Sequence, residues 1–281
     1  MPILSVRDLT VDLMTAAGVI RAVDGVAFDI DSGETVTIIG ESGSGKSTTA
    51  MALLRLLPDD LAVLTGHAEL TGKDVIGTRK HINGLRGRTV ALVPQDPMTA
   101  LNPIATVGRQ MVEAIRLRHR CGKSDAGQRA LSLLRQVHLS RPEQRLKQYP
   151  HELSGGMLQR VLIAMALSAE ADLIVADEPT SALDVTVQAG ILDLLLEIQQ
   201  ETGVGILLIT HDLGVARLMS DRIHVMQSGR FVESGPVEDV VDRPQHEYTR
   251  KLLEAIPKLG PWDDTDVPTA RKLELMNGGA S

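Results

Sequence analysis

The N-terminal part of the chain alternates hydrophobic and polar residues in two stretches, residues 3–13 and 22–30, with Gly18 between them. A period of two predicts half-buried strands, and the turn at the glycine predicts that the two strands pair antiparallel. Residues 35–40 then form an uninterrupted apolar run, which is typical of a strand buried on both faces in a parallel sheet. An antiparallel β subdomain followed by the first strand of a parallel sheet is therefore expected.

Most of the remaining chain switches repeatedly between helical spacing and short apolar runs. The pattern predicts helices over 46–57, 107–139, 155–168, 187–201 and 213–219, and strands over 88–95, 172–177, 205–210 and 222–227. Such alternation indicates an α/β fold, into which the helical stretch at about 97–168 is inserted. Residues 59–87 are turn-rich and predict no single element. We expect one domain over 1–257 and a mobile tail over 258–281, where no hydrophobic period is visible.

A glycine-rich loop follows the first buried strand, with the sequence GESGSGKST at residues 40–48. It fits the pattern G-x-x-x-x-G-K-[ST], in which backbone N–H groups converge on the phosphates of a nucleotide. Lys46 would reach the β- and γ-phosphate oxygens of ATP, and the Ser47 hydroxyl would bind Mg²⁺. The strand before the loop and the helix after it argue against a chance glycine turn. The predicted ATP-binding residues here are Gly40, Glu41, Ser42, Gly43, Ser44, Gly45, Lys46, Ser47 and Thr48.

Four polar residues follow further apolar runs, and the carboxyl ends of parallel strands would bring them to one edge of the sheet. Asp177 would bind Mg²⁺, and Glu178 would orient and deprotonate the attacking water as the catalytic base. His211 would donate to the γ-phosphate and hold that water in place. Gln95 would reach the nucleotide, the metal and the water. An acidic pair in a loop commonly has no role beyond contact with solvent. The catalytic interpretation therefore depends on these residues lying at the same edge of the sheet as the phosphate loop.

A second phosphate-binding arrangement stands far from the first, in LSGGMLQR at residues 153–160. A serine and two glycines open a predicted helix, and a helix start offers free backbone N–H groups and the positive end of the helix dipole. The loop at residues 40–48 already supplies one phosphate site, so this second arrangement requires a separate explanation.

The chain contains four motifs in this order, GESGSGKST, LSGGMLQR, LIVADEPTSALD and LLITHD, with Gln95 between the first two. Through these motifs it resembles the ATPase subunits of ABC transporters over about residues 3–257. The resemblance implies a P-loop NTPase core with an antiparallel β subdomain and a helical insertion, and ATP hydrolysis coupled to transport. It also implies a head-to-tail dimer, in which each ATP lies between one phosphate loop and the partner's LSGG motif. The residues implied to contact the partner's ATP are Ser154, Gly155, Gly156 and Gln159.

The same resemblance implies partners and a location. Asp184 corresponds to a dimer contact, and Gln95 with residues 96–103 corresponds to the segment that senses nucleotide and touches the membrane subunits. The implied partners are ABC permease subunits, a second ATPase subunit (the same chain or a paralogue) and, indirectly, a substrate-binding protein. The chain would lie peripherally on the cytoplasmic face of the inner membrane.

Residues 95–103 and 243–257 resemble the peptide and nickel importer branch of this family. Import of di- or oligopeptides is the first expectation, and nickel import is the alternative. Several peptide-importing relatives carry a cysteine cluster for an iron–sulfur centre, which is not expected here because Cys121 is the only cysteine. Leu13 occupies the position where many ABC ATPases stack an aromatic ring on adenine, which predicts weaker discrimination among purine nucleotides.

Composition narrows the remaining alternatives. The formal net charge of −7 gives no electrostatic basis for binding nucleic acid, and aromatic residues at 2% are too few for base-stacking platforms. The sequence contains no run of about 18 apolar residues, so no membrane-spanning helix is predicted. ABC ATPases that act on DNA or ribosomes usually have two fused ATPase halves, whereas this sequence has one phosphate loop. An ATPase accessory to a soluble enzyme complex stays open as a further alternative.

Overall fold

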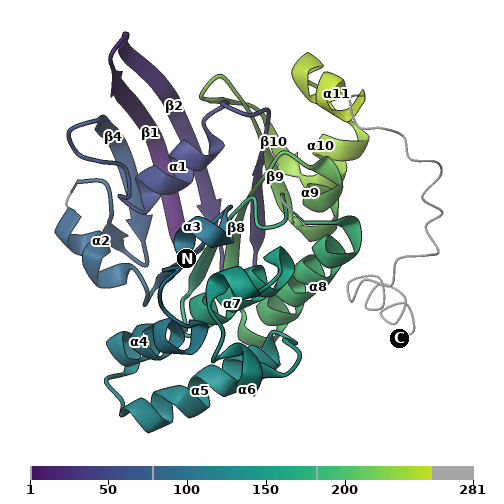
Figure 1. The fold of residues 1–281 in the computed structure, drawn as a ribbon. Helices are drawn as coiled ribbons and strands as arrows, with labels where there is room; N and C mark the ends of the chain where they lie inside the picture. The colour runs from purple at the N-terminus through teal and green to yellow at the C-terminus, as the bar shows by residue number, and fades with distance from the viewer. Residues whose placement is uncertain (1, 78, 182, 255–281) are drawn as a thin grey trace, which may run out of the picture.

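The computed structural model describes residues 2–77, 79–181 and 183–254, which form two sheets with helices packed around them (Figure 1). The smaller sheet is antiparallel, with the strand order β2-β1-β4-β5. Its strands are β1 (Leu4–Thr15), β2 (Gly18–Ile30), β4 (Ala62–Leu70) and β5 (Lys73–Asp74). The predicted antiparallel pair is confirmed, since β1 and β2 pair from Leu4 with Ile30 to Thr15 with Gly18.

The larger sheet has six strands in the order β10-β9-β3-β8-β7-β6. They are β3 (Thr35–Ile39), β6 (Val90–Val93), β7 (Leu173–Asp177), β8 (Gly205–Thr210), β9 (Arg222–Gln227) and β10 (Arg230–Pro236). Neighbours from β9 to β6 pair in parallel, and β10 is antiparallel at the edge. Every residue of β3, β7 and β8 is buried, which explains why these strands are apolar runs without alternation.

Helices pack around both sheets, and those from α3 to α7 form the predicted insertion. They are α1 (Lys46–Leu53), α2 (Arg79–Leu85), α3 (Pro97–Ala100), α4 (Val107–His119), α5 (Lys123–Gln136), α6 (Pro142–Arg145), α7 (Gly155–Leu167), α8 (Val185–Thr202), α9 (Leu213–Met219), α10 (Val237–Asp242) and α11 (Glu247–Glu254), with a 3-10 turn at Pro150–Glu152. In Figure 1, α4, α5 and α6 lie together at the end of the molecule away from the antiparallel sheet. None of the helices in the described part of the chain combines the length and apolar character needed to span a bilayer.

One buried core joins the helical insertion to the larger sheet. It includes Met111 of α4 and Leu134 of α5 together with Val93 of β6 and Ala176 of β7. A second core lies between the two sheets and α1, with Val11 of β1 among its members. The insertion is therefore packed directly against the strands whose ends carry the predicted site.

Two predicted helices differ from the structure by more than two residues at an end or by a break. The helix expected over 46–57 ends at Leu53, because the chain turns at Arg55, whose φ is +51°, before Pro58 is reached. The helical stretch 107–139 consists of two helices, α4 and α5. They are separated where Arg120 adopts a left-handed φ of +50°.

Six elements outside the helical insertion are not predicted. The turn-rich residues 59–87 contain β4, β5 and α2, while β10, α10 and α11 follow the last predicted strand. Most residues of β4 and β10 are exposed or half-buried, so their hydrophobic alternation is weak. The tail over 258–281, predicted to be mobile, lies outside the described residues.

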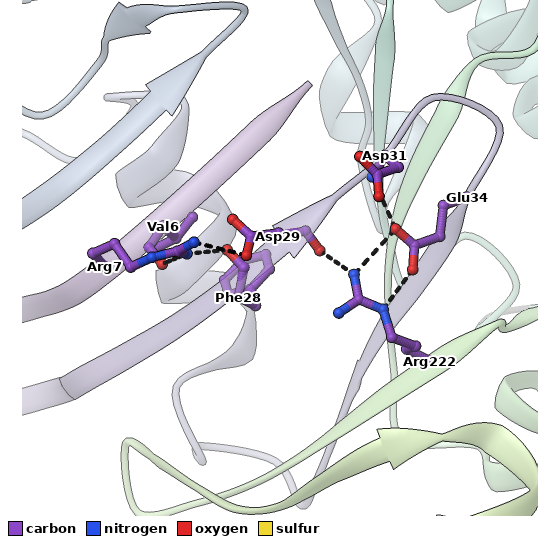
Figure 2. Close-up of polar contacts among 7 residues, drawn as sticks. All are labelled: Val6, Arg7, Phe28, Asp29, Asp31, Glu34 and Arg222. Atoms are coloured by element: carbon purple, nitrogen blue, oxygen red, sulfur yellow. Dashed lines mark hydrogen bonds and ion pairs between the residues drawn. The ribbon is translucent and has the colours of Figure 1, made fainter. Parts of the chain in front are cut away.

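A network of charged residues joins the two sheets beside β9 (Figure 2). Arg222 of β9 pairs with Glu34, with its Nε 2.5 Å from Oε1, and donates from Nη2 to the carbonyl oxygen of Asp29 on β2 at 2.7 Å. The Asp29 carboxylate accepts from Arg7 of β1 at 2.8 Å. The bond to Glu34 raises the pKa of Arg222, and the bond to Arg7 lowers the pKa of Asp29. Strands from both sheets are thus held together by one polar network.

His224 of β9 is buried between the sheets, with 6% of the residue exposed. Its ring centroid lies 4.7 Å from that of Phe231 and 5.6 Å from that of Phe28, and its Nδ1 is 2.8 Å from Ser234 Oγ. Its Nε2 has no hydrogen-bond partner within the described residues. Burial is the main cause that lowers the pKa of His224 to about 4.

His224→Phe should reduce the pH dependence of stability in weak acid. Because the folded pKa of about 4 lies below the ordinary value of 6.5, the unfolded chain takes up the proton first as the pH falls. Protonation of His224 in the unfolded chain should lower the free energy of unfolding of the wild type by about 2 kcal/mol between about pH 7.5 and about pH 5. The variant lacks the imidazole and should not show this contribution. Urea unfolding at both pH values measures the difference, and equal losses in the two proteins would exclude His224 as the cause.

Candidate active site

The phosphate loop connects β3 to α1, and its path depends on two glycines. At Gly45, directly before α1, φ is +109° and an added Cβ would lie 2.3 Å from the carbonyl oxygen of Ala22. A Cβ at Gly40 would lie 2.2 Å from the carbonyl oxygen of Met226 on β9. Because both contacts are with strand backbone, which cannot move aside, only glycine lets the loop approach the sheets this closely.

Lys46 is buried although it is charged, with 4% of the residue exposed. Its Nζ donates to the carbonyl oxygens of Gly40 and Glu41, each at 2.8 Å. Burial lowers the pKa of Lys46, and the nearby carboxylates of Glu178 and Asp177 act in the opposite direction. The ammonium group is thus held inside the loop, where phosphate oxygens would be stronger partners than backbone carbonyls.

Asp177 is the last residue of β7 and is 3% exposed. Its Oδ1 accepts a hydrogen bond from Ser47 Oγ at 2.8 Å. Burial is the main cause that raises the pKa of Asp177, and the bond from Ser47 acts against it. A carboxylate and a hydroxyl side by side fit Mg²⁺, which typically takes one or two protein oxygens and completes its shell with phosphate oxygens and water.

Glu178 stands at the point where three strand ends meet. Its φ of +44° lies in the left-handed region, which is unfavourable for a residue other than glycine, and its N–H donates to Ile209 of β8 at 2.8 Å. Its Oε2 accepts from Gln95 Nε2 at 3.0 Å, and its Oε1 lies 3.1 Å from His211 Nδ1. Since β6, β7 and β8 are neighbours, the structure brings together three residues that sequence reasoning selected separately.

A cavity of about 820 Å³ opens over these residues. Its lining includes the predicted residues Glu41, Ser42, Gly43, Gly45, Lys46, Ser47, Thr48, Gln95, Glu178 and His211. Gly40, Ser44 and Asp177 are buried and are not among the lining residues.

The cavity is also lined by residues of β1 and β2. Leu13, the position predicted to replace an adenine-stacking aromatic, lies in the lining opposite its cross-strand partner Ile20. Sequence reasoning missed Ile20 because it placed the turn at Gly18, whereas the turn residues are Ala16 and Ala17 and β2 begins at Gly18. It also missed the lining residues Arg21, Ala22, Ser228 and Gly229, for which no motif in the sequence gives a signal.

The LSGG segment is placed at the start of α7, and the lining of this cavity does not include it. Ser154 and Gly155 are exposed, and within the described residues the Ser154 side chain does not cap the helix. A Cβ at Gly156 would lie 2.3 Å from Val187 Cγ1 of α8, so helix packing also requires a glycine there. Gln159 is 1% exposed, so its side chain is not available to a partner's ATP, contrary to the prediction.

Asp184 is exposed at the start of α8. Its Oδ1 accepts from the backbone N–H of Val187 at 3.0 Å and so caps that helix. The cap gives Asp184 a structural role within this chain. Its contact with a second subunit stays a prediction.

Comparison with known families identifies the class of protein that this fold and site define. Residues 23–181 match the family described as ABC transporter, and this segment contains the phosphate loop, Gln95, the LSGG motif and Glu178. Residues 232–278 match the oligopeptide/dipeptide transporter C-terminal region. The chain therefore belongs to the ABC transporter family, as an ATP-binding subunit that hydrolyses ATP.

Individual relatives agree with this assignment. The chain is 48% identical over 259 residues to the dipeptide transport ATP-binding protein DppD of Bacillus subtilis (strain 168), covering 92% of this chain and 77% of the relative. It is 44% identical over 259 residues to the oligopeptide transport ATP-binding protein OppD of the same organism, covering 92% and 72%.

Solved structures show the same architecture. The fold is similar to the dimeric ATP-binding cassette MJ0796 in a post-hydrolysis state bound to ADP and Pi, with a TM-score of 0.74 and 28% identity. The match covers 83% of this chain and 98% of that chain. The predicted fold class, a P-loop core with an antiparallel β subdomain and a helical insertion, is confirmed.

Lys46→Ala should weaken ATP binding at least about tenfold, because it removes a charge-assisted hydrogen bond of about 1.5–3 kcal/mol to the phosphates. Isothermal titration with ATP and Mg²⁺ measures the change. Lys73→Ala, which removes an exposed lysine from β5, is the matched control and should leave affinity unchanged. Wild-type affinity in Lys46→Ala would show that the phosphate loop is assigned wrongly.

Proposed function

We propose that this ATPase is the energy-coupling subunit of an ABC importer for di- or oligopeptides. The observation that carries the proposed catalytic site is the convergence of Gln95 and His211 on the Glu178 carboxylate, beside the phosphate loop. The substrate class is supported by the match of residues 232–278 to the oligopeptide/dipeptide transporter C-terminal region, and by the names of the two Bacillus subtilis relatives.

Hydrolysis requires a water in line with the γ-phosphate and a group that accepts its proton. Glu178 is proposed as that base, with Gln95 orienting one carboxylate oxygen and His211 the other. As the water oxygen bonds to the γ-phosphorus, the bond to the bridging oxygen breaks. ADP leaves with that electron pair, and the proton of the water passes to Glu178. The left-handed backbone of Glu178 aims its carboxylate into the cavity.

Ser47, Asp177 and Gln95 are the residues proposed to hold Mg²⁺. When bound, Mg²⁺ would neutralise charge on the β- and γ-phosphate oxygens. Ser47 and Asp177 already lie within hydrogen-bond distance, and Gln95 is positioned by its bond to Glu178. The burial that raises the pKa of Asp177 would be offset by the cation, so the carboxylate would bind it ionised.

A second ATPase subunit, either another copy or a paralogue, would complete each nucleotide site. Ser154, Gly155 and Gly156 of one subunit would contact the γ-phosphate held by the partner's loop, with Asp184 at the dimer contact. ATP would then be held from both sides and ADP from one, and this difference in affinity lets hydrolysis open the dimer. The solved cassette of the same fold is dimeric with ADP and Pi bound, which supports a dimer that would open once Pi has left.

The segment after Gln95 is proposed to contact the permease subunits. It forms α3 and the loop that follows, where the apolar side chains of Met98 and Ile104 are 47% and 83% exposed. Apolar side chains at this exposure suit a protein contact. The chain would then lie peripherally on the cytoplasmic face of the inner membrane, and a substrate-binding protein would act on it only through the permeases.

Nickel import is the second candidate. Residues 95–103 and 243–257 resemble a branch of the family that includes nickel importers. Several peptide-importing relatives hold an iron–sulfur centre on a cluster of cysteines, and this sequence has only Cys121, which cannot form such a cluster. An ATPase accessory to a soluble enzyme complex would differ from both, because it would co-purify with enzyme subunits and not with permeases.

Glu178→Gln should bind ATP with nearly wild-type affinity but hydrolyse it about 10²- to 10⁴-fold more slowly, because the amide cannot accept the proton. The uncleaved ATP should trap a dimer that light scattering detects. Glu143→Gln, an exposed residue of the helical insertion, is the matched control and should turn over normally. Unchanged turnover in Glu178→Gln would remove Glu178 from the proposed role.

Deletion of this gene should abolish uptake of a labelled dipeptide and leave uptake of labelled nickel unchanged. Expression of the wild type should restore dipeptide uptake, whereas expression of Glu178→Gln should not, because transport requires hydrolysis. If nickel uptake alone were lost, the peptide assignment would be wrong and the nickel importer correct. If neither changed, co-purification with enzyme subunits would be tested next.

A further inference from the structure

The C-terminal helix α11 reaches the phosphate loop through one side chain, Tyr248. This residue is 8% exposed and packs in an apolar cluster with Ile39 of β3, Leu213 of α9 and Val225 of β9. Its Oη accepts a hydrogen bond from the backbone N–H of Glu41 at 3.1 Å. A side chain 207 residues further along the chain therefore contacts the first residues of the loop.

The N–H of Glu41 and the carbonyl of Gly40 belong to the same planar peptide group. That carbonyl accepts a hydrogen bond from Lys46 Nζ at 2.8 Å, so the peptide is held by Tyr248 at one end and by Lys46 at the other. Rotation of the peptide plane would break both bonds. Tyr248 therefore fixes the start of the loop independently of whether Lys46 is bonded to the loop or to a phosphate.

Glu233 of β10 holds the start of α11 in place. Its Oε1 accepts from the N–H of Gln245 at 2.7 Å, and its Oε2 accepts from the N–H of His246 at 3.1 Å. Because these groups directly precede α11, the carboxylate fixes the direction in which the helix begins. These contacts lie in the region that matches the oligopeptide/dipeptide transporter C-terminal region.

We propose that Tyr248 is a positioning residue for nucleotide binding, which holds the Gly40–Glu41 peptide so that the phosphate loop is ordered before the nucleotide arrives. The inference rests on the proposed nucleotide site and extends it, because it gives the C-terminal region a part in ATP binding. Tyr248 acts through the backbone and is not a catalytic residue. Without its hydroxyl, ordering of the loop would have to accompany binding and would lower the affinity.

Tyr248→Phe tests this inference, because it removes the hydroxyl and keeps the buried ring. Affinities for ADP and for a non-hydrolysable ATP analogue, each with Mg²⁺, should weaken by a similar factor of about three to ten, the effect of one hydrogen bond. The KM for ATP should rise by the same factor while kcat stays within about twofold, because the loop affects all bound states alike. The thermal midpoint without nucleotide should fall by no more than about 4 °C.

The matched control is Tyr149→Phe, which removes the hydroxyl of the other tyrosine, an exposed residue of the helical insertion, and should leave both affinities unchanged. Lys46→Ala measured alongside separates the two proposals. If Lys46→Ala loses affinity and Tyr248→Phe does not, the inference about Tyr248 is wrong and the nucleotide site stands. If Lys46→Ala keeps wild-type affinity, the nucleotide site itself is wrong. A lower thermal midpoint in Tyr248→Phe with unchanged affinities would make Tyr248 purely structural and overturn the inference.

Discussion

The parallel pairing of the larger sheet is the constraint that places the active site. Ile39 pairs with Thr210 and Asp177 pairs with Ile209, so β3, β8 and β7 end at the same edge. The phosphate loop and the catalytic loops begin directly after these strands, which is why Ser47 and Asp177 meet although 130 residues separate them. Burial of the apolar strands drives formation of the sheet, and the same process assembles the site at its carboxyl edge.

This assembly puts charged groups where water is excluded. Lys46 and Asp177 are 4% and 3% exposed. Burial lowers the pKa of Lys46 and raises that of Asp177, so in both cases it favours the neutral form. Hydrogen bonds compensate each charge in part, from the loop carbonyls for the lysine and from the Ser47 hydroxyl for the aspartate, and the two opposite charges also stabilise each other. Phosphates and a divalent cation would supply full opposite charges, so a highly charged ligand gains more here than a neutral one of the same shape.

The sequence predicts those parts of the fold where burial is uniform or clearly periodic, and it predicts site residues that directly follow the uniformly buried strands. β7 is wholly buried and reads as an apolar run, so Asp177 and Glu178 at its end could be recognised. Every residue of β10 is exposed or half-buried, so no hydrophobic spacing indicates this strand, and no spacing indicates the contact of Tyr248 with Glu41. Gly156 is a harder case, because close packing on α8 disfavours a larger residue there whether or not the proposed phosphate contact forms.

The start of α7 is the feature of this chain that the proposed second subunit would use. The helices α4, α8 and α9 begin with Thr106, Asp184 and Asp212, whose side chains accept hydrogen bonds from the first N–H groups. Ser154 makes no such bond within the described residues and is exposed, so α7 presents its N–H groups and the positive end of its dipole to the outside. An anion from another molecule would satisfy both. In the proposed dimer that anion is the γ-phosphate, so cleavage followed by release of Pi would remove the group that holds the two subunits together.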